Sequence, residues 1–288
     1  MDTMNRPFAG TDNEAIFQLR DLYKDYDELT GVIQRIKNRW ATTHKDIDPS
    51  FHPLIGTEDG QMGLKSLKDK TSRLLEKQLR LWPLWSEWLV NVPGCGPRIA
   101  APLILSYYYR FTPTCQSCGG ALTRNEGTLT CLNCGKEAKG EGVLLVKPEE
   151  RDFPTVSKWR AYCGRHVLDD KMPKRKAGQV SNWSTKLRTA TYHLADQFNR
   201  QTTKTPYGRF LLERKAKAVK DHPDLTPGHR LNMAKHEASC LFLSHFWHVA
   251  RTMDGKSTDG PYAQVILGHT GIIPPYHWGE EGLDKVGS

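Results

Sequence analysis

Four of the seven cysteines in this 288-residue chain form the pattern that most restricts its fold. Cys115 and Cys118 enclose two residues, twelve residues follow, and Cys131 and Cys134 enclose two more. A two-residue gap lets both sulfurs of a pair face one ion, and four thiolates form the tetrahedral set that Zn²⁺ takes. The pattern therefore predicts a structural zinc ribbon with one Zn²⁺ and no open position for catalysis. Two disulfides are the alternative, and an intracellular chain disfavours them.

Composition and charge predict a chain with a real core and an intracellular location. Hydrophobic residues make up 38% of the sequence, and the formal net charge is +9 at pH 7. The longest apolar runs fall well short of the ~18 residues that a membrane helix needs. The first residues, Met1 to Met4, lack the basic and apolar segments of a secretory signal. We therefore expect a cytoplasmic protein with no membrane partner. The positive net charge favours an anionic binding partner.

Two long amphipathic helices are predicted at the front of the chain. Apolar residues recur at steps of three and four over residues 13–40, and the same spacing returns over residues 64–82. The apolar residues expected on one side of the second helix are Leu64, Leu67, Leu74, Leu75, Leu79 and Trp82. The two helices predict a helical hairpin or a dimerising coiled coil, which would make the protein a homodimer. Packing as an ordinary helical bundle on the rest of the chain is the alternative.

A glycine-containing turn follows these helices. Residues 85–104 read as an apolar helix, the turn Pro93-Gly94-Cys95-Gly96-Pro97, and a second helix. This segment resembles the helix-hairpin-helix motif, in which amides at the start of the second helix face a nucleic-acid phosphate. We expect Gly94, Gly96 and Arg98 to position phosphate without reading base sequence. A helix–helix turn with no ligand is the alternative.

Positive charge is concentrated in residues 151–220. Seventeen Lys and Arg against five Asp and Glu give this segment a net charge of +12, whereas residues 1–50 carry −2. Its candidate nucleic-acid-binding residues are Lys171, Lys174, Arg175, Lys176, Lys186 and Arg188. Interspersed aromatics available for base stacking are Trp159, Tyr162, Trp183, Tyr192, Tyr207 and Phe210. This composition predicts nucleic-acid binding, to DNA with RNA as a second choice. The alternative is a solvated basic face whose aromatics lie in the core.

The predicted fold is mainly α, with a helical hairpin or coiled coil, a helix-hairpin-helix domain and a small β zinc-ribbon insertion. We expect the hairpin at 1–84, the helix-hairpin-helix at 85–111 and the ribbon at 112–147. A basic helical domain at 148–255 and an irregular tail at 256–288 complete the chain.

The order of these segments resembles a known family. After the Pro93-Gly94-Cys95-Gly96-Pro97 turn come Phe153-Pro154-Thr155, Trp159, and Tyr162-Cys163-Gly164, followed by a basic stretch that ends at Gly178. This order is similar to the C-terminal half of the insertion sequence 110/116/902 family of DEDD transposases, with the ribbon as an insertion. The resemblance covers roughly residues 64–250 and implies a mainly helical fold and DNA binding.

Two departures remove the family's active site from this chain. The residues ahead of the hairpin read as helix, so the RuvC-like nuclease domain with its four acids is not matched. The family's serine loop corresponds to residues 167–173, which contain no serine. We therefore assign no catalytic residue. A transposase or recombinase that works with a separate nuclease subunit, or a zinc-stabilised interaction scaffold, are the alternatives to a DNA-binding protein.

A second resemblance, to tyrosine recombinases, lies near the C-terminus. His248-Val-Ala-Arg251, Leu267-Gly268-His269 and Tyr276 occur in the order of the recombinase catalytic groups. In such an enzyme the tyrosine attacks a phosphodiester while arginine and histidine stabilise the phosphorus and protonate the leaving oxygen. The alternative is structural: Arg251 ends a helix, and residues 267–269 begin a packed tail. His245 and His248, three residues apart, could share one helix face.

Overall fold

The computed structural model divides the chain into two compact units, one formed by residues 1–104 with 153–288 and the other by Leu105–Asp152. The described residues are 13–44, 48, 52–56, 63–115, 117–120, 122–125, 128–138, 144–167, 172–175, 181–258 and 273–278. Helices dominate the described chain, which confirms the mainly α class. The first unit contains segments that the sequence analysis assigned to several separate domains.

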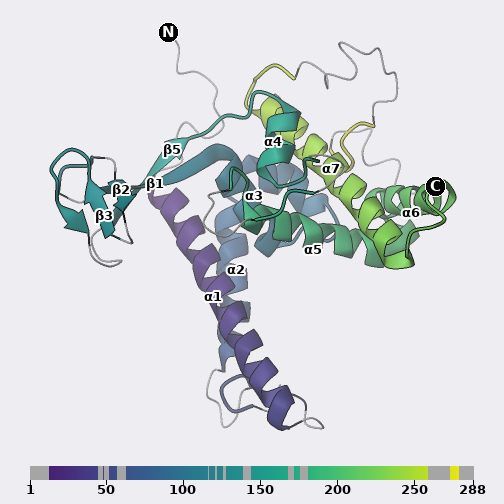
Figure 1. The fold of residues 1–288 in the computed structure, drawn as a ribbon, viewed down its shortest axis with the longest axis horizontal. Helices are drawn as coiled ribbons and strands as arrows, with labels where there is room; N and C mark the ends of the chain where they lie inside the picture. Colours follow the sequence, from purple (N-terminus) through teal and green to yellow (C-terminus); the bar gives the residue numbers. More distant parts are fainter. Residues whose placement is uncertain are drawn as a thin grey trace. The chain divides into compact units, whose positions relative to one another are not determined.

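An antiparallel helix pair opens the first unit (Figure 1). Helix α1 spans Asn13–Thr43 and α2 spans Leu64–Leu79. The Gln78 amide donates to the Gln18 side chain at 2.9 Å near the start of α1, whereas Ile33 and Ile36 pack with Ile55 toward the other end. The apolar steps seen in the sequence create this contact, because they place one stripe of each helix toward the other.

The buried stripe of α2 is narrower than the sequence predicted. Leu75, Leu79 and Trp82 are fully buried, as expected for residues one turn apart. Leu67 and Leu74 were expected on the same side, but their side chains are 40% and 43% exposed. The prediction was wrong for these two leucines because the 100° step between residues rotates them away from the helix that α2 packs against.

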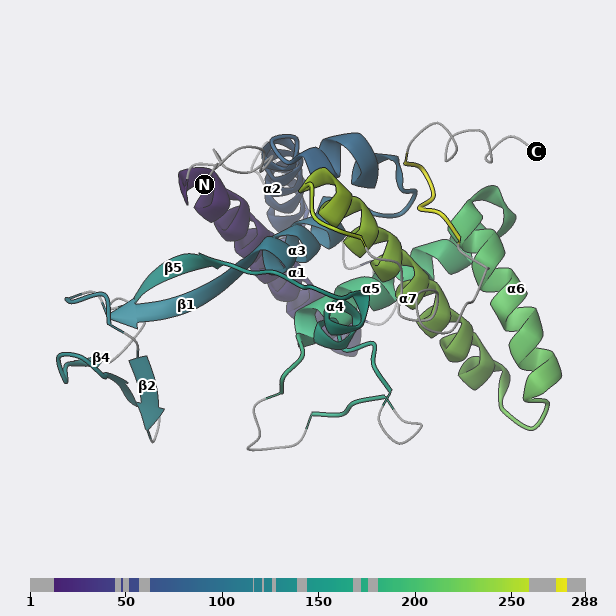
Figure 2. The same cartoon turned by 90° about the horizontal axis from the view of Figure 1, so that it is seen from above.

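The rest of the unit is a group of helices around α7. Two short helices, η2 (Leu84–Trp88) and η3 (Leu89–Asn91), lead into α3 (Pro97–Tyr108). Four further α-helices and a 3₁₀ turn follow: α4 Val156–Tyr162, α5 Thr185–Gln201, η5 Thr202–Lys204, α6 Pro206–Asp221 and α7 Pro227–Met253. Helix α7 packs against α4, α5 and α6, an arrangement that Figure 2 shows from above.

Each of these helices begins at a hydroxyl residue that caps it. Thr155, Ser184, Thr205 and Thr226 precede α4, α5, α6 and α7, and each side chain accepts a hydrogen bond from the backbone amide three residues on. Such caps satisfy amides that have no partner within the helix, and each contributes about 1 kcal/mol. Proline at the first position of α6 and α7 also favours their starts.

Aromatic side chains fill the space between α7 and its neighbours. Trp88 stacks on Phe242 with ring centroids 5.7 Å apart, and Trp159 stacks on Phe246 at 5.3 Å. Trp159, Trp183, Tyr207 and Phe210 of the basic segment are buried, whereas Tyr192 is 43% exposed. The stacking role considered for these four buried rings was therefore wrong. A large apolar ring at helical spacing gains more from core burial than from solvent exposure.

The second unit contains the strands. Strands β1 (Tyr109–Cys115) and β5 (Leu144–Glu150) pair antiparallel, so that Tyr109 lies opposite Glu150. A second sheet has the order β2-β3-β4, formed by Leu122–Asn125, Thr128–Cys131 and Glu137–Ala138. The sequence placed the insertion at 112–147, and the compact unit extends a few residues further on both sides. Among the described helices, none is both long and apolar enough to cross a bilayer.

Candidate functional site

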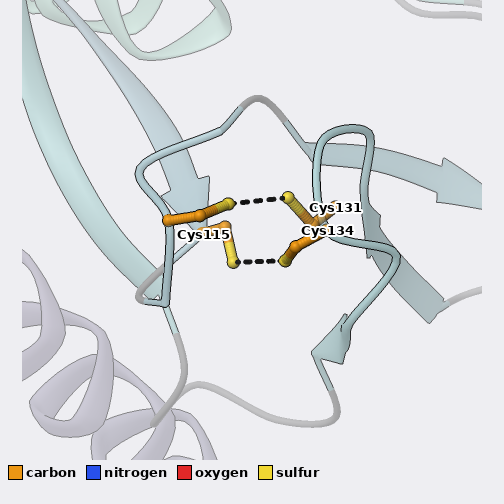
Figure 3. Close-up of side chains that lie close together, drawn as sticks. Cys115, Cys131 and Cys134 are labelled. Atoms are coloured by element: carbon orange, nitrogen blue, oxygen red, sulfur yellow. Dashed lines mark hydrogen bonds between the residues drawn. The ribbon is translucent and has the colours of Figure 1, made fainter.

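The four patterned cysteines lie together in the second unit. Cys115 ends β1 and Cys131 ends β3, while Cys118 and Cys134 lie in the turns that follow. Their sulfurs all lie within 4.8 Å of one another. The Sγ atoms of Cys115 and Cys134 are 3.7 Å apart, and those of Cys118 and Cys131 are 3.4 Å apart. Figure 3 shows Cys115, Cys131 and Cys134 turned toward one another.

Both turns have the same backbone geometry. The Gly119 amide donates to the Cys115 carbonyl at 2.8 Å, and the Gly135 amide donates to the Cys131 carbonyl at 3.0 Å. The two glycines have φ values of 69° and 66°, a region that other L-residues rarely adopt. Each glycine thus lets the chain turn back at the end of its cysteine pair.

The turning backbone also favours thiolates. The Ser117 amide hydrogen-bonds the Cys115 sulfur and lowers the pKa of this thiol. The Cys134 amide does the same for Cys131, whose pKa falls to about 6. Thiolate is the form of cysteine that binds metal ions. Cys131 is therefore prepared to act as a ligand near neutral pH, and the pKa of Cys115 is shifted in the same direction.

The pKa of the Cys118 thiol is shifted in the opposite direction. At Cys118 the Gly120 amide favours the thiolate, but hydrogen bonds with the sulfurs of Cys131 and Cys134 outweigh it and raise the pKa to about 12. Four crowded sulfurs cannot all ionise without a positive charge between them. A metal ion supplies such a charge, so these four cysteines could hold one.

The predicted phosphate-binding turn links η3 to α3. Gly94 has a φ of 89°, and a Cβ at this position would come within 2.7 Å of the Gln197 Cβ on α5. The Gln201 amide group spans the turn: in its satisfied orientation its nitrogen donates to the Pro93 carbonyl and its oxygen accepts from the Gly94 amide, each at 3.3 Å. The Ile99 amide then donates to the Gly96 carbonyl at 2.9 Å, which begins α3. The turn is thus held by α5.

A groove of about 520 Å³ opens in front of this turn. Gly94, Gly96 and Arg98 line it from the turn and α3, and Lys186 lines it from α5. These four residues are separated by up to 92 positions in the sequence, yet all of them border one groove. Gly96 has no atom within 4 Å of the place where a Cβ would stand, so its backbone is open to the groove.

Helix α1 supplies a wall of the groove that the sequence analysis missed. Tyr23, Tyr26 and Asp27 line it, because the polar side of α1 faces α5 here. The Lys186 ammonium lies 4.0 Å from the Asp27 carboxylate and 5.8 Å from the Tyr23 ring centroid. Burial, and then Asp27, raises the pKa of Tyr23 to about 12. No local motif marks these residues, since their role depends on α1 and α5, which are far apart in the sequence, bordering the same groove.

The other predicted basic residues lie elsewhere. Arg188 lines a neighbouring cavity of about 460 Å³ instead of the groove. Lys174 and Arg175 are exposed in the short segment that precedes α5. Lys171 and Lys176 lie outside the described residues.

The groups that resemble a tyrosine recombinase are engaged in packing. The buried Arg251 donates from Nε to the Ser257 carbonyl at 2.7 Å and from Nη1 to the Phe153 carbonyl at 3.3 Å. The Tyr276 ring packs edge-on against Tyr207, with centroids 4.8 Å apart. Residues 267–269 lie outside the described part of the chain. Arg251 therefore holds the end of α7 to the loop before α4, a structural role.

The histidine pair does not form a shared metal face. His245 is buried, its Nδ1 lies 2.8 Å from the Tyr207 hydroxyl, and its Nε2 lies 3.0 Å from the Ile273 carbonyl. A carbonyl can only accept, so Nε2 carries the proton and Nδ1 accepts from Tyr207. Both ring nitrogens are used, and the His248 ring lies against Trp278 instead.

Comparison with known proteins adds no family to this picture. No protein-family model, curated protein or solved structure shows significant similarity to the chain.

Proposed function

We propose that the first unit, called the helical unit from here on, binds nucleic acid and prefers DNA. It contacts the phosphate backbone of the nucleic acid. The observation that carries the proposal is the groove in which Gly94, Gly96 and Arg98 at the start of α3 lie with Lys186 of α5. The resemblance to insertion-sequence transposases favours DNA over RNA.

The start of α3 suits a phosphate for three reasons. A helix N-terminus carries unpaired amides and a partial positive charge, which attract anions. The open backbone at Gly96 lets a phosphate approach these amides closely. Arg98 and Lys186 add two full charges at the same groove. Contacts of this kind fix the position of a strand but do not read its bases.

The charge distribution of the helical unit supports a longer contact. Lys174 and Arg175 are exposed, and they belong to the segment of residues 151–220 that carries a net charge of +12. Each phosphate that a protein neutralises releases counterions, so binding weakens steeply with salt. We expect the basic segment to extend the backbone contact beyond the groove.

We also infer that the four cysteines bind one Zn²⁺ as a structural zinc ribbon. All-thiolate sets select Zn²⁺ or iron–sulfur clusters, and the paired turns match structural zinc sites. Four protein ligands leave no open position, so the ion stabilises the second unit and takes no part in a reaction.

The homodimer expected from the sequence remains part of the proposal. Leu67 and Leu74 lie exposed on α2 seven residues apart, and Leu81, seven residues further, is 58% exposed. A seven-residue repeat of leucines is typical of a helix that packs along a partner helix. We propose that the second copy of the chain covers this stripe.

Binding should be tested by fluorescence anisotropy with duplex DNA, single-stranded DNA and RNA of one sequence over a salt series. We expect log K to fall linearly with log salt, and Lys186→Gln to reduce the slope by about 1, which is the loss of one phosphate contact. Scrambling the DNA sequence should leave the affinity unchanged. Affinity that is independent of salt, or no binding to any of the three, would overturn the proposal.

A further inference from the structure

A second cavity of about 460 Å³ lies beside the groove. Thr189 and His193 of α5 border both, so the two hollows share one wall. The far side of the cavity comes from α7, through Asn232, Lys235 and His236. An arginine also lines this cavity, and its positive charge lacks an acidic partner in the described part of the chain.

That arginine is Arg165, which is only 7% exposed. Its Nε donates to the Thr191 hydroxyl at 3.0 Å and its Nη2 donates to the Arg188 carbonyl at 3.3 Å. Both acceptors are neutral. Among the described residues, no carboxylate lies within ion-pair distance of Arg165. Burial first, and Arg188 in addition, lower the pKa of Arg165 to about 10 against the opposing effect of the Cys240 thiol.

Arg188 adds a second charge of this kind. Its Nη1 donates to the Pro173 carbonyl, and its guanidinium lies 5.1 Å from the centroid of the Trp183 ring. Neither partner carries a negative charge. Lys235, by contrast, is matched, since its ammonium lies 2.7 Å from the Asp196 carboxylate. The cavity therefore contains two arginine charges without an acidic partner in the described chain.

His236 shows that the potential here is positive. Burial first, and then Arg165, Arg160 and Arg188, lower its pKa to about 4. A buried cation without a counter-ion is unfavourable, because neutral hydrogen-bond partners replace its lost water only in part. An anion in the cavity would remove this cost.

We propose that the cavity binds a phosphate monoester attached to a nucleoside. The planar forks of Arg165 and Arg188 fit the oxygens of a phosphate, and a monoester dianion matches two positive charges. The Asn232 amide and the Lys235 ammonium offer further donors on the α7 side. The Tyr192 ring, which is 43% exposed and lines the same cavity, provides a surface for the base.

Two sources can supply such a phosphate: a free mononucleotide, or the phosphorylated end of a strand lying in the groove. The strand-end form rests on the proposed function, because the groove and the cavity share Thr189 and His193. In that form the protein grips a strand by its backbone and recognises its terminus.

The test compares three twelve-nucleotide strands of one sequence, with a 5′-phosphate, a 3′-phosphate or hydroxyls at both ends, for binding to the full chain by fluorescence anisotropy. We expect one phosphorylated strand to bind about tenfold more tightly than the hydroxyl strand, the effect of one charge-assisted contact. Adenosine monophosphate is then titrated as a competitor of the bound strand at constant ionic strength, with sodium sulfate as the control anion. Competition by the nucleotide beyond that of sulfate shows that the cavity also binds a free mononucleotide.

Two variants locate the effect, and a third controls for charge. Asn232→Asp places a negative charge at an exposed position of the cavity, and Arg188→Gln removes a positive one. Both should bring the ratio between phosphorylated and hydroxyl strands close to one. Asn38→Asp makes the same change at an exposed site on α1 and should keep the full ratio.

The outcomes separate the two proposals. If all three strands bind equally and the mononucleotide competes no better than sulfate, the phosphate site is overturned while the nucleic-acid groove stands. If the mononucleotide binds the wild type but not Asn232→Asp, and no strand binds, the phosphate site is supported and the nucleic-acid groove is overturned. A phosphate preference that survives in both cavity variants would also overturn the site.

Discussion

The backbone of Gly94 lies against the side chain of Gln197, so closely that a Cβ on the glycine would stand 2.7 Å from the Gln197 Cβ. The φ of 89° at Gly94 adds to this constraint. Gly94→Ala should therefore lower the free energy of unfolding by about 1–3 kcal/mol, the usual cost of a strained non-glycine residue. Urea unfolding followed by circular dichroism measures this loss.

Gly96→Ala is the matched control, because the same methyl group meets no atom within 4 Å. Its stability should stay close to that of the wild type, while its Cβ enters the groove and weakens nucleic-acid binding severalfold. Gly96→Ala with unchanged affinity would contradict a phosphate at this backbone. The two glycines of the turn thus differ: Gly94 is needed for packing, and Gly96 gives access to the proposed phosphate.

The Pro-Gly-x-Gly turn shows which parts of the candidate site can be predicted from the sequence and which cannot. The turn and the cysteine pairs depend on local chemistry, such as positive φ at glycine and thiolate spacing, so the sequence indicates them directly. The walls of the groove depend on packing between distant helices. In the sequence Asp27 is one acid among several in residues 1–50, and nothing local shows that it faces Lys186.

Asp27 opposes the proposed ligand, and its removal should strengthen binding. The carboxylate lies 4.0 Å from the Lys186 ammonium and would face a bound phosphate. Asp27→Asn should raise the affinity for DNA by about two- to fivefold, in line with the value of an exposed charge interaction. Asp25→Asn, an equal change of charge outside the groove, is the control in the same anisotropy assay. Equal gains in both variants would mean that net charge, and not the groove, governs binding.

Removal of the metal should affect the second unit alone. Its sheets are small, and all four candidate ligands lie within Leu105–Asp152, whereas the aromatic core around α7 contains none of them. We expect one zinc per chain by elemental analysis, and Cys131→Ser or strong chelation should release it. The helical circular dichroism signal should remain largely unchanged.

Cys240→Ser removes a thiol outside the cluster and should keep the full zinc content. A collapse of the helical signal on chelation would show that the ion supports both units. Full zinc occupancy in Cys131→Ser would show that the four cysteines are not the site.

The exposed leucines of α2 allow a test of the dimer. Leu74→Lys places a charge in the middle of the stripe and should convert the protein from a dimer to the 32.7-kDa chain in sedimentation equilibrium, with little change in melting temperature. Val219→Lys, at a 48% exposed position on α6, should remain dimeric. A wild-type protein that sediments as a single chain would show the dimer prediction to be wrong.

The basic segment explains why composition alone is a poor guide to aromatic function. Trp159 and Tyr207 sit among lysines and arginines in the sequence, yet both are fully buried. Lys158, the residue before Trp159, faces solvent, because a helix places adjacent residues about 100° apart. Tyr192 is exposed, and only the structure distinguishes it from the buried rings.

The buried His245 should make the helical unit sensitive to acid. Burial lowers its pKa to about 3, against about 6.5 in an unfolded chain. Between these values the unfolded state binds a proton that the folded state excludes, so stability is complete above pH 6.5 and falls as the pH drops toward 3. At pH 5 the loss from this one group should be about 2 kcal/mol. Urea unfolding at pH 7 and pH 5 measures it.

Two variants separate the titration of His245 from the loss of its hydrogen bond. His245→Gln removes the ionisable ring, so the variant should be less stable than the wild type at pH 7 but should lose about 2 kcal/mol less between pH 7 and pH 5. Tyr207→Phe removes the hydrogen bond to Nδ1 but keeps the buried imidazole, so it should be destabilised while retaining the wild-type dependence on pH. The same pH dependence in His245→Gln as in the wild type would contradict this account, because the acid sensitivity would then arise from other groups, such as His236, whose pKa is also lowered.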